Sequence, residues 1–317
     1  MSKELEQAVR TVLVDCLAVE SGENVLVVTD PPKVALARAL VDGARSMGAE
    51  VVVAEMSERV TQGTEPPPQI AAAMLAADVV IAPTTKSLSH TEARHAASEK
   101  GARIATMPGV TEEMLGRTMS ADFKAIAERS AAIASLLSEG SVVHITTEKG
   151  TDVTFDIRGR EGLADDGGIQ APGAFGNLPA GEAFVAPVER KTNGRIAFDG
   201  SIWPVGVLED PLVIDIEDGY ARGFSGSAAE EFRSKLEPWG DEAFAVAELG
   251  IGTNEAAQLT GNVLEDEKIL GTIHVAFGDN HSFGGKIRVA SHQDGIVLKP
   301  TVVIDESPLL TAGRMLI

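Results

Sequence analysis

The sequence predicts an α/β protein with a doubly wound parallel-sheet domain at residues 1–140, followed by an α+β domain with a mixed or antiparallel sheet at residues 141–317. Three observations predict this arrangement. The 317 residues are 44% apolar, which suits two domains of ordinary size. Up to residue 140, continuous apolar runs alternate with helical patterns. Beyond it, short alternating runs are separated by turn-forming residues.

The first domain is Rossmann-like because its strand runs lack polar alternation. Apolar residues from Val9 to Leu17 have helical spacing, and the run NVLVVT at residues 24–29 predicts the first strand. Strands buried on both faces are typical of a parallel sheet covered by helices. Further helices are expected at residues 34–47, 69–76, 89–99 and 121–137, and further strands at residues 50–55, 78–82 and 103–106.

The second domain begins after the turn at residues 138–140. Residues 141–146 and 152–157 alternate between apolar and polar, and one or two helices are expected in the remainder. This pattern predicts an antiparallel or mixed sheet.

Composition excludes several classes of partner. The 27 Lys and Arg against 47 Asp and Glu give a formal charge of −20, so neither nucleic acid nor an anionic membrane surface is expected to bind. The single cysteine, Cys16, lies at an apolar helical position and is predicted to be in the core, without a disulfide or a cysteine-rich zinc site. No signal peptide or membrane-spanning run is found, so a cytoplasmic location is expected.

The first domain is not expected to bind a cofactor. Its first strand-to-helix turn reads TDPPKVA, with prolines where a dinucleotide fingerprint needs glycines, which argues against NAD or FAD. His90 and His95 are five residues apart and do not form an i, i+4 pair for a metal, so we interpret them as surface or interface histidines.

Three candidate metal ligands lie in apolar surroundings of the second domain. Glu182 lies where a loop rich in glycine and proline enters the apolar run AFVAP. Glu248 lies within the apolar AFAVAELGIG, and His274 lies within GTIHVAFG. A buried charge needs a partner, which is either a cation such as a metal or, for Glu248, a buried Lys or Arg. A lone histidine such as His274 is more often a hydrogen-bonded core residue than a ligand.

Two more candidate ligands occur together in SHQDG. His292 and Asp294 are separated by one residue, so both side chains point the same way in an extended strand. His281 lies on a polar turn beside Gly284 and Gly285, where loops often carry function. Imidazole and carboxylate donors without thiolate suit one or two divalent ions of Zn, Co, Mn or Fe(II). Glu248 and His281 are the candidate catalytic residues.

With these segments in place, the sequence resembles the thermophilic-type metalloaminopeptidases related to aminopeptidase T, the M29 peptidases. The matching segments are NLPAGE, AELGIGTN, DEKILGTIHVAFG and SHQD. The resemblance implies a homodimer and a two-metal centre held by Glu182, Glu248, His274, His292 and Asp294. It also implies an aminopeptidase activity, in which the metal centre activates water against the N-terminal peptide bond of a short peptide.

The same superfamily includes proteins like 2,5-dihydroxypyridine 5,6-dioxygenase, which gives an alternative function. This chain is shorter than the peptidases, and His281 stands where they place a tyrosine. In the alternative, His274, His292 and Asp294 hold a single Fe(II) for ring cleavage of a small dihydroxypyridine-like molecule. Glu182 and Glu248 then support the ligands, and His281 transfers a proton or binds substrate. The sequence leaves both functions open.

Overall fold

The computed structural model describes residues 2–317, which form two compact units. The first unit runs as far as Phe123 and takes in Gly167–Ala180, whereas the second consists of Lys124–Asp166 and Gly181–Ile317. The division therefore differs from the predicted boundary at residue 140 in two respects. The helix α6 (Phe123–Glu139) packs in the core of the second unit, and a later segment returns to the first unit to add a strand.

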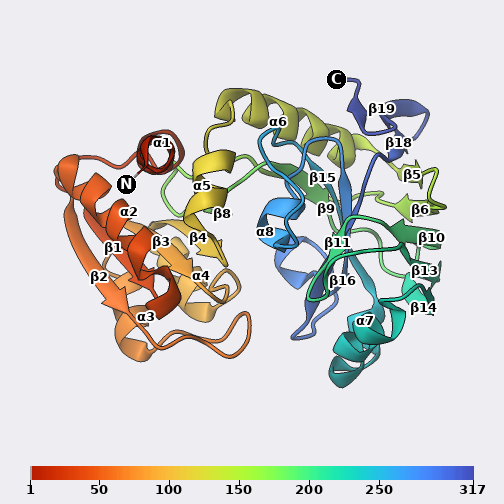
Figure 1. Cartoon of the computed structure of the whole chain (residues 1–317), viewed down its shortest axis with the longest axis horizontal. Helices are drawn as coiled ribbons and strands as arrows, with labels where there is room; N and C mark the ends of the chain where they lie inside the picture. Colours follow the sequence, from red (N-terminus) through yellow and green to blue (C-terminus); the bar gives the residue numbers. More distant parts are fainter. Residues whose placement is uncertain (1) are drawn as a thin grey trace. The chain divides into compact units, whose positions relative to one another are not determined.

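The first unit is built on a parallel sheet, here called sheet A, with the strand order β2-β1-β3-β4-β8. The predicted doubly wound α/β arrangement is confirmed (Figure 1). Its strands are β1 (Asn24–Thr29), β2 (Glu50–Glu55), β3 (Val79–Thr84), β4 (Arg103–Pro108) and β8 (Phe175–Asn177). Its helices are α1 (Lys3–Arg10) with a π-helical extension (Thr11–Cys16), a 3-10 turn (Pro31–Lys33), α2 (Val34–Ser46), α3 (Pro68–Met74), α4 (Glu92–Glu99) and α5 (Glu112–Thr118).

Both faces of the inner strand β1 are buried. Leu26 and Val28 belong to a core cluster with α3 and α4, and the opposite-facing Val25 and Val27 are also buried. The strand β2 is different, because it lies at the sheet edge and its Val52 is 62% exposed. The covering of sheet A on both faces therefore does not extend to β2. An edge strand has a neighbour on one side only, so less of the fold covers it.

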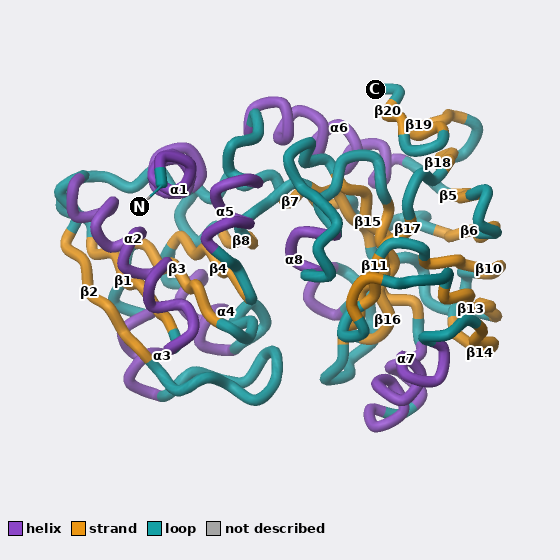
Figure 2. Tube along the Cα trace, viewed as in Figure 1, coloured by secondary structure: helices purple, strands orange, loops and turns teal. Residues whose placement is uncertain are grey.

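The second unit contains two antiparallel sheets. Figure 2 shows that strands and loops dominate this part of the chain. Sheet B has the order β14-β13-β10-β6-β5-β18-β19-β20, and sheet C has the order β12-β11-β17-β16-β15-β9-β7. The strands of sheet B are β5 (Val142–Thr146), β6 (Asp152–Asp156), β10 (Asn193–Phe198), β13 (Leu212–Glu217), β14 (Tyr220–Ser225), β18 (Thr301–Ile304), β19 (Ser307–Thr311) and β20 (Arg314–Met315). Those of sheet C are β7 (Leu163–Asp165), β9 (Glu182–Val185), β11 (Ser201–Ile202), β12 (Gly206–Val207), β15 (Val246–Gly252), β16 (Ile273–Gly278) and β17 (His292–Val297).

One apolar core joins these two sheets. Phe155 and Ile214 from sheet B lie in the same buried cluster as Leu249, Val275 and Val297 from sheet C. The helices α6 and α7 (Ala229–Leu236) add residues to this core, while α8 (Val263–Asp266) is a single turn. Short 3-10 turns occur at Glu237–Trp239, Asp241–Phe244 and His281–Phe283. Because strand side chains alternate between faces, the residues next to these core positions point to the other face of sheet C.

Over residues 2–317, no helix combines the length and the apolar character that crossing a bilayer requires.

Candidate metal centre

Strand register places all five predicted ligands on the face of sheet C that points away from the core. Glu182 is opposite Gly252 of β15. His274 is opposite Gly250, which lies two residues earlier on the same strand. Glu248 and Asp294 are both opposite Ala276, and His292 is two residues before Asp294 on the same strand. Residues directly opposite each other, and residues two apart on one strand, share a face. The four neighbouring strands β9, β15, β16 and β17 therefore assemble the site.

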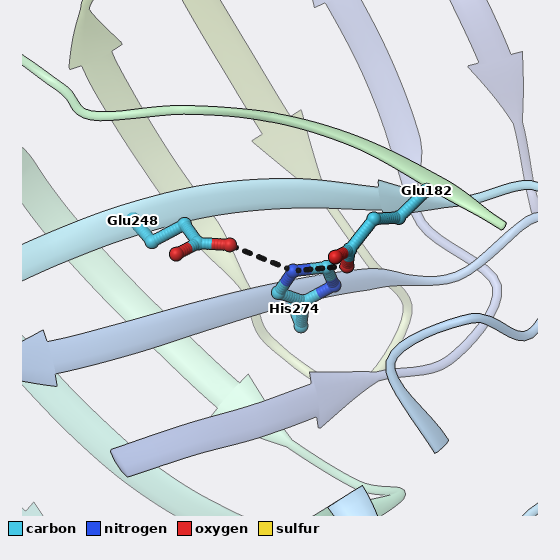
Figure 3. A group of neighbouring side chains, drawn as sticks. All are labelled: Glu182, Glu248 and His274. Atoms are coloured by element: carbon cyan, nitrogen blue, oxygen red, sulfur yellow. Dashed lines mark hydrogen bonds and ion pairs between the residues drawn. The ribbon is translucent and has the colours of Figure 1, made fainter. Parts of the chain in front are cut away.

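His274 lies between two carboxylates, as Figure 3 shows. Its Nε2 atom is 3.2 Å from Glu248 Oε1 and 3.2 Å from Glu182 Oε2. Ligand atoms of these three buried residues all lie within 4.8 Å of one another, a spacing that a single metal ion can span. The structure thus brings together three of the five predicted ligands at one point.

A glycine makes room for the imidazole. A Cβ atom added to Gly250 would lie 1.9 Å from His274 Nε2, far inside van der Waals contact. The backbone of β15 therefore allows the ring to cross this strand and reach Glu248 and Glu182. Gly250, the first glycine in AELGIG, has a steric role that periodicity alone does not indicate.

His292 and Asp294 extend the site on the other side of Glu248. His292 Nε2 lies 3.5 Å from Glu248 Oε2 and 3.5 Å from Asp294 Oδ1. The two oxygens of Glu248 therefore face different histidines. His292 Nδ1 lies 2.8 Å from the backbone oxygen of Asp279. Because a carbonyl only accepts, Nδ1 carries a proton, and Nε2 is the nitrogen that becomes available to a metal ion once it loses its own proton.

Lys268 is the group that the sequence interpretation did not identify. Its side chain is fully buried, and its Nζ atom lies 2.5 Å from Glu182 Oε1, 2.8 Å from Glu267 Oε1 and 3.4 Å from Asp165 Oδ2. In the sequence it stands in the charged run EDEKILG, which resembles an exposed turn. Neither charge nor periodicity indicates that such a lysine is buried, so only the tertiary structure reveals it.

Burial and charge shift the protonation of the histidines and of Glu248. Burial alone disfavours charge, but hydrogen bonds from His274 and His292 outweigh it and hold the pKa of Glu248 below its usual range. For His274, burial is outweighed by Glu248 and Glu182, which raise the pKa to about 9. The pKa of His292 is raised well above its usual value despite burial, chiefly by Asp294 and Glu248. In the absence of a metal, protons on the imidazoles compensate the carboxylates.

For the acidic groups around Lys268, burial outweighs the attraction of the nearby positive charge, so their pKa values are raised. Burial raises the pKa of Glu182 to about 8 and that of Asp165 to about 6, although Lys268 opposes both shifts. The pKa of Lys268 itself is raised well above normal, because Glu182, Glu267 and Asp165 outweigh its burial. This corner of the site thus contains more negative charge than one ammonium neutralises.

The donor set fits a divalent metal ion. Glu182 Oε2 and His274 Nδ1 are buried and make no hydrogen bond among the described residues. Buried polar atoms without partners are costly, and a cation beside Glu182 Oε2 would satisfy one of them. Asp294, Glu248 and both imidazoles supply oxygen and nitrogen donors without sulfur, a set that suits Zn, Co, Mn or Fe(II).

His281 lies outside this cluster. It is exposed on the 3-10 turn His281–Phe283, where its Nε2 atom pairs with Arg288. The neighbouring Phe283 packs edge-on against His292, with ring centroids 5.9 Å apart, and also against Phe184. The turn thus contacts the site through Phe283, and a catalytic role for His281 stays a prediction.

Cys16, His90 and His95, which were also considered from the sequence, lie outside the metal centre. Cys16 is buried in the first unit, in agreement with its predicted core position. His90 is exposed, and His95 is half-buried on α4, where its ring contacts Arg94. Neither histidine belongs to the cluster of metal-binding groups found among residues 2–317.

Comparison with known proteins gives one family and two similar structures. The family model described as NicX, 2,5-dihydroxypyridine 5,6-dioxygenase, matches residues 4–317. The structure of a 2,5-dihydroxypyridine dioxygenase from Pseudomonas putida KT2440 has 20% identity and a TM-score of 0.86, covering 100% of this chain and 98% of that one. AmpT from Thermus thermophilus has 17% identity and a TM-score of 0.74, covering 99% of each chain. No curated protein sequence matches the chain.

The family match confirms the resemblance to 2,5-dihydroxypyridine 5,6-dioxygenase, and the two structural matches at such low identity show a shared fold. Together with the buried carboxylate and imidazole cluster, they identify a divalent metal ion as the cofactor of this chain. The family model covers nearly every residue, and it describes enzymes. The chain belongs to the 2,5-dihydroxypyridine 5,6-dioxygenase family.

Proposed function

We propose that this protein is a mononuclear Fe(II) dioxygenase that opens the ring of a small dihydroxylated pyridine-like molecule. The observation that carries this proposal is the family match over residues 4–317. The site agrees with it, because His274, His292 and Asp294 on neighbouring strands provide two imidazoles and one carboxylate on a shared face. This proposal replaces the aminopeptidase activity, which the sequence favoured.

The protein's own groups orient the three ligands. The backbone oxygen of Asp279 fixes the His292 ring, and Gly250 gives the His274 ring its space. When bound, Fe(II) supplies positions at which dioxygen and a chelating hydroxylated ring react. The side chain of His292 is 28% exposed, whereas that of His274 is 1% exposed, so substrate approaches from the His292 side.

Other side chains near the ligands serve substrate binding and proton transfer. Phe283 and Phe184 pack edge to face with centroids 5.6 Å apart, and Phe283 borders His292, so an apolar wall is available to a flat aromatic ring. Glu248 has a pKa below its usual range and stays ionised, so its carboxylate can accept a hydrogen bond from a hydroxyl group of the substrate. His281 is proposed to exchange the proton of a substrate hydroxyl with solvent.

A metal-dependent aminopeptidase is the second candidate, and one observation favours it. Glu248 directs one oxygen to His274 and the other to His292, as a carboxylate that bridges two metal ions does. In that function Glu182 and Glu248 would be ligands, and a short peptide would be the substrate. The homodimer implied by the sequence resemblance stays a prediction under either function.

The test compares both activities on one preparation. Protein reconstituted with Fe(II) without air is then assayed for oxygen uptake with 2,5-dihydroxypyridine and for release of nitroaniline from aminoacyl-nitroanilides. We expect oxygen uptake and no nitroaniline. His292→Ala should abolish oxygen uptake together with bound iron, whereas His144→Ala, at an exposed strand position of sheet B, should change neither. Nitroaniline release without oxygen uptake would establish the aminopeptidase instead.

A further inference from the structure

The buried Lys268 is surrounded like a metal ion. Three carboxylates converge on its Nζ atom: Glu182 at 2.5 Å, Glu267 at 2.8 Å and Asp165 at 3.4 Å. Glu182 lies in β9, Glu267 directly follows α8, and Asp165 lies in β7. Converging carboxylate oxygens in a buried site are the environment that divalent cations select.

Glu182 connects this position with the metal centre. Its Oε1 atom contacts Lys268, while its Oε2 atom lies 3.2 Å from His274 Nε2 and makes no hydrogen bond among residues 2–317. The carboxylate therefore spans two adjacent cation positions, one filled by the ammonium and the other at the histidines. In a two-metal site, such a carboxylate would bridge the two ions.

The backbone fixes Lys268 in this place. Its N–H donates to the carbonyl of Glu265 at 2.9 Å, and its own carbonyl accepts from Asn254 at 2.8 Å. The preceding Asp266 is fully buried and accepts from Ser201, Thr260 and Gly261. The backbone that carries Lys268 is therefore held by the fold, which keeps the ammonium within reach of the three carboxylates.

We propose that the Lys268 ammonium takes the place of a second metal ion, so that this chain binds one ion at His274, His292 and Asp294. The proposal rests on the mononuclear site of the proposed function and explains what restricts it to one ion. A dication placed among Asp165, Glu182 and Glu267 would meet the ammonium at contact distance and be repelled. Removing the ammonium charge should open a second metal position among these three carboxylates.

The experiment counts Co²⁺ bound to metal-free protein after gel filtration, by elemental analysis and calorimetric titration. Wild type should bind about one ion per chain, and Lys268→Met should bind about two. Lys235→Met makes the same change at an exposed position of α7 and should remain at about one. Adding Glu267→Gln to Lys268→Met removes one of the three carboxylates and should return the count to about one.

Two outcomes would overturn the proposal: a wild type that binds two ions, or a folded Lys268→Met that binds only one. Should Lys268→Met fail to fold even with Co²⁺ present, the Mn²⁺ spectrum of wild type decides by electron paramagnetic resonance. An isolated ion supports the proposal, and a magnetically coupled pair overturns it. Metal counting requires no turnover, so one bound ion without oxygen uptake would contradict the proposed function and leave Lys268 in its role.

Discussion

The central strands of sheets A and C are buried to a similar extent, yet they contain different chemistry. In sheet A, β1 and β3 read NVLVVT and VVIAPT, and their buried positions carry no ionisable side chain. In sheet C, every residue of β15 and β16 is buried, and these strands contain Glu248 and His274. Sheet A can be stabilised by apolar burial alone. Sheet C contains charges that need partners.

This difference shows which buried strands to examine for function. A buried ionisable group is costly unless the fold or a ligand compensates it, so it persists where it is used. In sheet C, the large apolar core lies on the face shared with sheet B, and the ionisable groups collect on the opposite face.

The largest expected effect is a loss of metal affinity in Gly250→Ala, for which Gly116→Ala in the first unit is the control. Gly250→Ala places a Cβ atom 1.9 Å from His274 Nε2, so the ring must leave its position. Metal affinity should fall at least about 100-fold, the upper range for lost support of a ligand. Gly116→Ala on α5 places its Cβ atom no closer than 3.5 Å to a neighbour. It should leave metal binding unchanged and stabilise the helix by about 0.5–1 kcal/mol.

Calorimetric metal titration and thermal unfolding of both variants check this prediction. Equal metal affinity for Gly250→Ala and wild type would mean that His274 is not a ligand.

Metal removal should affect the two sheets unequally. A ligand present at a thousandfold excess over its dissociation constant stabilises the folded state by about 4 kcal/mol. Removing the ion with a chelator should therefore lower the melting temperature and accelerate amide hydrogen exchange in β9, β15, β16 and β17. The strands β1 and β3 should change less, because apolar contacts stabilise them. If confirmed metal loss accelerated amide hydrogen exchange equally in sheets A and C, the prediction that the metal stabilises mainly sheet C would be refuted.

His281→Ala compares the site with the loop that borders it. Because His281 is exposed and pairs with Arg288, its replacement should leave metal content and stability unchanged. Turnover should fall by about 100-fold, the lower range for an assisting acid or base. Steady-state rates and metal analysis on the same sample test this. Loss of metal in parallel with activity would instead make His281 a ligand.

The smallest effect is the uptake or release of protons. In the metal-free protein, the pKa of His274 is raised to about 9 and that of His292 is also raised, so both rings are protonated at neutral pH. A metal ion binds only deprotonated imidazole, so binding should release about one to two protons per ion. The release should disappear as pH rises above these pKa values. Titration calorimetry in buffers of different ionisation enthalpy measures it, and zero release at neutral pH would contradict the predicted ligands.

The sequence was sufficient to predict the local elements and the types of ligand. The expected strands at residues 24–29 and 50–55 coincide with β1 and β2, and α2 ends within one residue of its prediction. Apolar periodicity determines these elements, and it operates over a few residues. Glu182, Glu248 and His274 were recognisable as candidate ligands because each is an ionisable residue in an apolar run or at its start. Spacing within SHQD also predicted correctly that His292 and Asp294 share a face.

Only the tertiary structure decided how distant segments meet. Residues 167–180 return to sheet A although their composition gives no sign of it, because pairing between β4 and β8 depends on contacts far apart in sequence. The burial of Lys268 among Asp165, Glu182 and Glu267 has the same origin. A local pattern reports whether a residue suits a helix, a strand or the surface. Three-dimensional packing determines which group compensates a buried charge. The reason is that electrostatic interaction depends on distance in space and not on distance along the chain.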